Sequence, residues 1–191
     1  MNQDEYFSVH AGLTINVEPL EPQAIVPSNE AFLQEIPPLF RIASECSAID
    51  DNMERSLTQL NKKEFQSLSD YLVAQNNKIN LMLGFIMAQQ DHAEHRFVTT
   101  TFGASKLTYL SDTPLAVGQA VRLKIFLDKP TAAIYAYAEV SECQQEAEHK
   151  QAEITLSYTH LLEADRDIII RAALHFQQKF LRQRAQQRTE N

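Results

Sequence analysis

Alternating apolar and polar residues between 97 and 162 constrain the fold of this chain more than any other feature of its sequence. Successive side chains of a β-strand point to opposite faces, so a period of two predicts strands with one face in a core. Pro114 and Gly118 mark a turn inside the region. Four or five strands joined by short turns indicate a small antiparallel barrel. The apolar positions of the clearest runs are Leu107 and Tyr109; Val121, Leu123, Ile125 and Leu127; Ile134, Ala136, Ala138 and Val140; and Ile154, Leu156 and Tyr158.

A further strand is predicted over residues 6–18, where six apolar residues from Phe7 to Val17 occupy every second position. Prolines that begin at Pro19 end this strand and make the residues up to 27 an extended linker. An isolated strand exposes its backbone hydrogen-bonding groups. We therefore expect this N-terminal part, 1–27, to pair either with the later sheet or with a partner chain.

The next part, residues 28–91, is predicted to be helical, because its apolar residues mostly recur at spacings of three, four or seven. Pro37 and Pro38 end a short first helix and start the next, since proline suits the first position of a helix. The segment 63–90 lacks proline and predicts a long helix. Around 79–87 the apolar residues spread over most of its circumference, a pattern that requires burial on several sides.

Two arrangements would bury this helical region. It could pack against the barrel, or it could form a coiled-coil bundle between subunits through residues 44–90. One small β domain covers only one side of a helix, so we favour a homo-oligomer, either a dimer or a tetramer, while packing within the chain stays open. Gln75 interrupts the apolar seam, and a polar seam residue costs stability but fixes register and partner number.

The sequence ends in a predicted helix over about 164–187. Asp165 and Asp167 lie near its start, which suits the positive end of the helix dipole. The cations near its end, from Lys179 onward, suit the negative end. A nucleic-acid contact is the weaker alternative, because no aromatic residues interleave with the arginines after Phe180.

Composition excludes several classes of protein. The chain has 191 residues and a net charge of −8, so it should repel nucleic acid and anionic membranes. The longest apolar run, 81–88, is far shorter than the roughly 20 residues of a membrane helix. The N-terminus shows no secretory signal, and the two cysteines lack metal-ligand spacing. We therefore expect a cytoplasmic protein with reduced thiols and without membrane insertion.

Two stretches carry a family resemblance. The segment KLTYLSDTPLAVGQAVRLKIFL and the ending LLEADRDIIIRAALHFQQKFLRQRA resemble the PilZ domain, the bacterial module that reads cyclic di-GMP. The resemblance covers roughly 92–185, and we assign the PilZ-like barrel with its C-terminal helix to 92–191. It implies an α+β fold in which a long helical region precedes a small antiparallel barrel. That arrangement is similar to the atypical branch of the family, which assembles through such helices.

The resemblance also implies a nucleotide site. A typical PilZ site uses R-x-x-x-R, because a planar guanidinium stacks on guanine and bonds phosphate or the base edge in two places. Here the stretch is H-A-E-H-R, with His92 and Arg96 at the two arginine positions. The second element, D/N-x-S-x-x-G, corresponds to T-F-G-A-S-K, with Thr101 first and Ser105 supplying a serine only after a shift of two residues. These four residues are the candidate cyclic di-GMP site, and one of five expected residues matches cleanly.

We expect a PilZ-type signalling adaptor of the bacterial cyclic di-GMP system, with a degenerate nucleotide site, protein partners and helix-mediated self-assembly. One alternative is a cyclic di-GMP receptor that binds through a non-standard site around Arg96, aided by Arg41 or Arg55 of a neighbouring subunit. A second alternative is a structural scaffold without a ligand. Catalytic motifs and phosphate-binding glycine loops are missing, so we expect no enzyme, no cofactor and no metal site, with cyclic di-GMP as the possible ligand.

Overall fold

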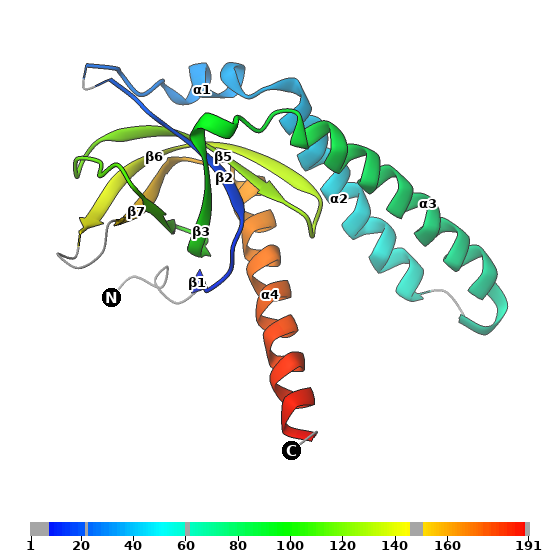
Figure 1. Cartoon of the computed structure of the whole chain (residues 1–191). Coiled ribbons are helices and arrows are strands. Elements are labelled where there is room, and N and C mark those ends of the chain that lie inside the picture. The colour runs from blue at the N-terminus through cyan, green and yellow to red at the C-terminus, as the bar shows by residue number, and fades with distance from the viewer. Residues whose placement is uncertain (1–7, 22, 60–61, 146–150, 190–191) are drawn as a thin grey trace.

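The computed structural model describes residues 8–21, 23–59, 62–145 and 151–189 of the chain. Figure 1 shows a β-barrel, a pair of long helices that projects from it and a C-terminal helix that leaves it in another direction. The strands are β1 (Ser8–Val9), β2 (Thr14–Pro19), β3 (Arg96–Gly103), β4 (Lys106–Ser111), β5 (Ala120–Leu127), β6 (Ala132–Gln144) and β7 (Ala152–His160). The helices are α1 (Asn29–Glu35), α2 (Pro38–Gln59), α3 (Lys62–Ala88), the short 3-10 helix η2 (Ala93–His95) and α4 (Glu163–Thr189).

The sheet closes into an antiparallel barrel of six strands. Its order is β3–β2–β5–β6–β7–β4, and β4 pairs back with β3. This confirms the predicted α+β fold with a small barrel, a preceding helical region and a C-terminal helix. The alternating apolar residues point inward, and Ile15, Leu123 and Ile134 are fully buried in the same core. The six-strand barrel takes β2 from the N-terminal part of the chain and its other five strands from the part after the helices.

The N-terminal segment pairs with the later sheet of its own chain, which is one of the two predicted alternatives. A single continuous strand was the wrong prediction, because β1 and β2 are separate and both pair with β3. Between them, the hydroxyl of Thr99 accepts a hydrogen bond from Leu13 N at 2.9 Å and donates one to Ala11 O at 2.7 Å. A side chain thus replaces part of the backbone ladder, and the strand bends there. Residues 6 and 7 lie outside the described residues.

The first two helices cover the outer face of β6. Ser28 caps α1 by accepting a hydrogen bond from Ala31 N, as an N-cap serine does. Phe32 of α1 is buried, with its ring centroid 6.1 Å from that of Tyr135 and 6.1 Å from that of Tyr137. These two tyrosines point away from the barrel interior, yet they are buried because α1 and α2 form a second core on that face.

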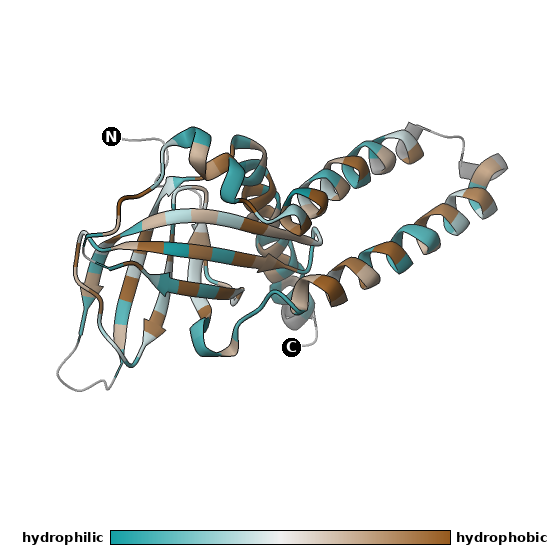
Figure 2. Cartoon of the chain, turned by 90° about the horizontal axis from the view of Figure 1, so that it is seen from above, coloured by the Kyte–Doolittle hydropathy of each residue, from teal (hydrophilic) through white to brown (hydrophobic). Residues whose placement is uncertain are grey.

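The long helix α3 confirms the predicted helix over 63–90, and most of its length is far from the barrel. Leu83 and Met87 near its C-terminal end are buried in the second core. Figure 2 shows α2 and α3 extending together from the barrel, with apolar residues along α3. The helix therefore reaches the barrel at one end only.

The last helix, α4, covers the barrel with its first half. Ile169 and Ala172 join the barrel core, and Phe176 packs edge-on against Phe102. Asp165, which the sequence placed at the helix dipole, is also buried and accepts a hydrogen bond from Ser44 of α2 at 2.7 Å. The second half of α4 continues past the barrel into solvent (Figure 1).

Candidate functional site

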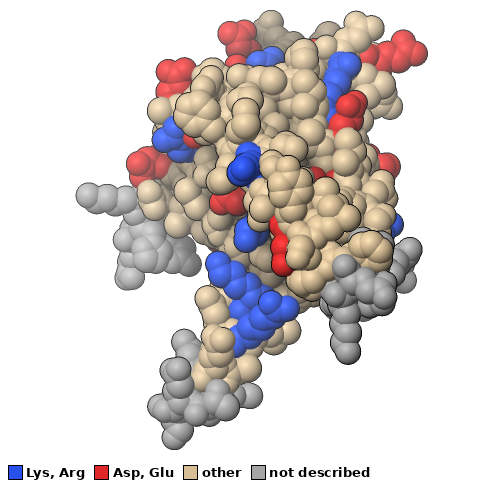
Figure 3. Space-filling model, turned by 90° about the vertical axis from the view of Figure 1, so that its right-hand side faces the viewer, with Lys and Arg blue, Asp and Glu red and all other residues tan. Residues whose placement is uncertain are grey.

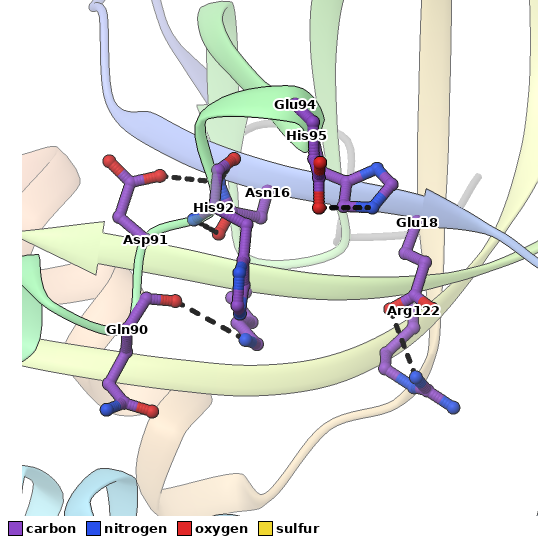
Figure 4. Close-up of polar contacts among 9 residues, drawn as sticks. Asn16, Glu18, Gln90, Asp91, His92, Glu94, His95 and Arg122 are labelled. Atoms are coloured by element: carbon purple, nitrogen blue, oxygen red, sulfur yellow. Dashed lines mark hydrogen bonds and ion pairs between the residues drawn. The ribbon is translucent and has the colours of Figure 1, made fainter.

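The connection from α3 to β3 is fixed to the barrel by one buried side chain, Asn16 of β2. Its amide nitrogen donates to Asp91 Oδ1 at 2.7 Å, and its carbonyl oxygen accepts from His92 N at 2.9 Å. Figure 4 shows Asn16 between these residues of the connection and the sheet. Because Asn16 uses both its donor and its acceptor here, it determines where the chain enters β3.

The candidate residue Arg96 is held at this entry. Its Nε lies 2.6 Å from Oδ2 of Asp91, whose side chain is only 13% exposed. The arginine side chain is 48% exposed. The same carboxylate therefore accepts from both Asn16 and Arg96, and the Nε edge of the guanidinium is occupied within the chain.

Two further cations lie on neighbouring strands, and the sequence analysis did not single them out. Lys124 of β5 is paired with Asn16 in the sheet, and its Nζ donates to Gln90 O at 3.4 Å. Desolvation lowers the pKa of Lys124. Arg122 of β5 lies 3.0 Å from Glu18 Oε2 on β2. The alternation in β5 could have identified both residues, because it turns them to the outer face of the barrel.

The structure brings the four candidate site residues together in two pairs, not in one group. His92 and Arg96 lie at the start of β3, with His92 at the N-cap position of η2. Thr101 pairs with Thr108 near the end of β3, and Ser105 lies in the turn that follows. At about 3.3 Å of rise per strand residue, Arg96 and Thr101 are about 16 Å apart along the strand. A ligand at one end of β3 would therefore need to extend along the strand to reach the other end.

A second candidate for function is an apolar stripe on α3. Seven positions follow each other at alternating steps of three and four residues, the heptad spacing of coiled coils. Within it, Ile79 is 55% exposed and Met82 is 67% exposed. We refer to this set as the α3 stripe. Its members are Phe65, Leu68, Leu72, Gln75, Ile79, Met82 and Ile86.

Comparisons with known proteins place the fold. No family model matches the chain, and no curated protein matches it. Among solved structures, a Xanthomonas campestris protein described as a tetrameric PilZ domain self-assembled through an unusual helical bundle is 12% identical. The match covers 95% of this chain and 92% of that one, with a TM-score of 0.52.

A second solved structure is the Bacillus subtilis inhibitor of motility, MotI/DgrA, at 11% identity and a TM-score of 0.49. The match covers 94% of this chain and 53% of that one, so this chain spans about half the length of that protein. Together with the closed six-strand barrel, the likeness to the Xanthomonas structure shows that this chain has a PilZ-like fold.

Two features are absent from the part of the chain that the structure describes. No helix among the described residues has both the length and the apolar character to cross a membrane. These residues also contain no cluster of three or more histidine, cysteine or acidic side chains placed to hold a metal ion.

Proposed function

We propose that this chain is a PilZ-type signalling adaptor of the bacterial cyclic di-GMP system that assembles with copies of itself through the α2–α3 pair. The observation that carries the proposal is the α3 stripe on a PilZ-like fold. A row of large apolar side chains exposed along a projecting helix is typical of an interaction surface. The Xanthomonas protein of similar fold is described as self-assembled through a helical bundle.

The stripe has the properties of a coiled-coil seam. Burying a side chain such as Ile79 or Met82 contributes about 1.5–3 kcal/mol. Six apolar positions would therefore supply ample free energy for association, even after the entropic cost of bringing subunits together. Gln75 in the middle of the seam would select the partner number at some cost in stability.

The nucleotide-binding part of the proposal is a degenerate site. His92 replaces an arginine, so the fork that would bond phosphate or a guanine edge is missing there. Arg96 is already paired with Asp91. Each charge-assisted hydrogen bond is worth about 1.5–3 kcal/mol, so losing two or three of them weakens binding by several powers of ten.

One observation favours the alternative, a receptor with a non-standard site. Arg96 keeps about half of its side chain exposed, and His92 is exposed on the same connection. If the chain is such a receptor, Arg96→Ala should abolish its measurable affinity for cyclic di-GMP. An affinity that survives this change would contradict the placement of the site.

Two measurements test the proposal. Calorimetric titration with cyclic di-GMP should give no heat at tens of micromolar ligand, whereas saturable heat would favour the receptor. Light scattering of the full chain should give the mass of a dimer or a tetramer, and a monomeric mass would contradict self-assembly. A chain that neither assembles nor binds any signalling protein would leave the adaptor proposal without support.

A further inference from the structure

A groove separates the projecting helices from one edge of the barrel. It has a volume of about 1150 Å³ and is lined by α2, α3 and the turn between β5 and β6. Its apolar lining includes Val73, Leu81 and Phe85 of α3, which are all exposed. None of the seven stripe residues lines the groove, so the groove and the α3 stripe are different surfaces of the same helix.

The polar lining of the groove is acidic. It contains four aspartates and one lysine, Lys129. Asp51 pairs with Arg171 and Asp91 pairs with Arg96. The ion pairs of the described residues include neither of the other two, Asp50 and Asp128. Among the described residues that line the groove, aspartates therefore outnumber cations by four to one.

The groove also contains a buried acceptor without a donor. Asn80 of α3 donates its amide to Asp50 Oδ2 at 2.9 Å. Its carbonyl oxygen Oδ1 is buried and has no hydrogen-bond partner in the structure. An unsatisfied buried acceptor is costly. An occupant of the groove that brings cationic or amide donors would remove this cost.

The end of α4 has the complementary chemistry. Beyond Arg171 the sequence has no acidic residue before Glu190. Its cations Lys179, Arg182 and Arg184 are exposed, and Figure 3 shows basic side chains gathered on the projecting part of the helix. Opposite charges on two surfaces favour their association and fix its register.

The exposed leucines of this helix end lie on one face of the helix. Leu174 and Leu181 are 40% and 66% exposed, and their spacing of seven places them on one face of the helix. Arg182 and Arg184 lie on either side of that face, at about 100° per residue. The helix end thus presents an apolar line flanked by cations.

We propose that the end of α4 of one copy docks into the groove of a second copy of this chain. An α-helix is about 10–12 Å wide with side chains and rises 5.4 Å per turn, so two turns occupy about 1000 Å³. The groove volume matches two turns. The α4 end of the same chain is carried away from the barrel as one continuous helix (Figure 1), so the occupant comes from another copy. This contact goes beyond the assembly through the α3 stripe.

Gly84 provides the sharpest variant. It lines the groove, and a Cβ placed on it would have no atom within 4 Å. Gly84→Trp would therefore fill the groove without a clash at the Cβ, and Gly84→Ala is the matched control with almost no added volume. On the helix side, the double variant Leu181→Glu with Arg182→Glu removes the apolar line and reverses one charge on exposed positions.

The experiment mixes ¹⁵N-labelled and unlabelled full chain and joins amines to carboxylates with a zero-length carbodiimide. Lys179 lies about 160° around the helix from Leu181, so every chain in the experiment carries Arg184→Lys, which places an amine beside the docking face. We expect mixed-isotope peptides that link position 184 of one copy to Asp50 or Asp128 of the other. Their yield should fall at least tenfold in Gly84→Trp and in the α4 double variant, and stay within twofold in Gly84→Ala. Mixing Gly84→Trp with the α4 variant should restore a link in one direction only, from position 184 of the Gly84→Trp chain to the groove of the α4 variant.

Several outcomes would overturn the proposal. These are the absence of mixed-isotope links from position 184, a yield that Gly84→Trp leaves unchanged, or restoration in the opposite direction. Co-sedimentation with phosphatidylglycerol vesicles that depends on Arg182, in the absence of the links, would instead assign the helix end to a membrane surface. The stripe variant Ile79→Glu with Met82→Glu separates the two contacts. If stripe-mediated assembly is wrong, that variant leaves the mass unchanged, whatever the links from position 184 show.

Discussion

The carboxylate of Asp91 joins two residues that the sequence leaves unrelated: it accepts from Arg96 at 2.6 Å and from the buried Asn16 at 2.7 Å. The Asp91–Arg96 pair is partly exposed, and exposed ion pairs contribute little to stability. The bond to Asn16 is in a more buried environment, where losing a partner costs more. The two halves of the arrangement should therefore respond very differently to substitution.

Arg96→Ala should lower the free energy of unfolding by less than about 1 kcal/mol, because its side chain is half exposed and solvent screens the pair. Urea unfolding monitored by circular dichroism measures this. Added salt should reduce the difference between the native chain and the variant further. A loss well above 1 kcal/mol would show that Arg96 has a structural role that its exposure does not indicate.

Asn16→Ala should cost about 2 kcal/mol, because it removes buried hydrogen bonds to the connection before β3. The same urea unfolding measures it, with Asn52→Ala as the control at an exposed position. The control should stay within about 0.5 kcal/mol of the native chain. Equal effects of the two variants would contradict the role of Asn16 in fixing the connection.

Phe32→Ala should destabilise the chain by about 3–5 kcal/mol, the usual cost of truncating a buried phenylalanine. It would remove the ring that packs between α1 and the tyrosines of β6. Leu33→Ala, one residue further on the exposed side of α1, should change stability by less than about 0.5 kcal/mol. Thermal unfolding of the two variants side by side would reveal whether α1 is part of the cooperative core.

Asp165→Asn should stabilise the protein at neutral pH. Burial raises the pKa of Asp165, and the hydrogen bond from Ser44 opposes that rise only in part. A raised pKa means that the folded state favours the protonated acid. The stabilisation of the fold from this group is complete below the unfolded pKa of about 3.9 and is lost as the pH rises through the folded pKa. Each unit of the rise costs about 1.4 kcal/mol at neutral pH, less a few tenths for the lost interaction with the helix dipole.

The measurement for Asp165 is urea unfolding of the native chain and Asp165→Asn between pH 4 and 7. The advantage of the variant should grow as pH rises and be smallest at pH 4. Asp167→Asn is the control on the exposed side of the same turn. A stability difference that is flat across this range would contradict a raised pKa.

Ile79→Glu with Met82→Glu should convert an oligomer into a monomer, because the two changes place charges in the seam of the α3 stripe. Both side chains are more than half exposed in the single chain, so the fold itself should be retained. Asp70→Lys changes the charge of an exposed residue on the side of α3 opposite the stripe and should leave the mass unchanged. Light scattering coupled to size-exclusion chromatography measures all three.

Local sequence pattern was sufficient for most of the secondary structure. The period of two in Val121–Leu127 predicted β5, and the proline-free segment after residue 62 predicted α3. Tyr135 and Tyr137 show the limit of such patterns, because alternation turned them outward and the packing of α1 and α2 buried them. The bend at Thr99 was also beyond local pattern, since its hydroxyl bonds backbone groups of the segment between β1 and β2, 86–88 residues away.

The candidate site was predicted in part. The sequence identified Arg96 and the missing partner arginine at His92, because these are single positions of a linear motif. It did not identify Asn16, Lys124 or Arg122, since each acts through a neighbour on a different strand. It also grouped Thr101 and Ser105 with Arg96, whereas the length of β3 separates them.

By itself, the sequence determined where most strands and helices form, because periodicity and turn chemistry act over a few residues. Tertiary structure alone decided how β2 closes the barrel across the helical insertion and how Asn16 and Asp91 hold Arg96. It also decided which sides of α3 and α4 remain uncovered. These features depend on contacts between residues far apart in the chain, and such contacts exist only once the barrel has closed.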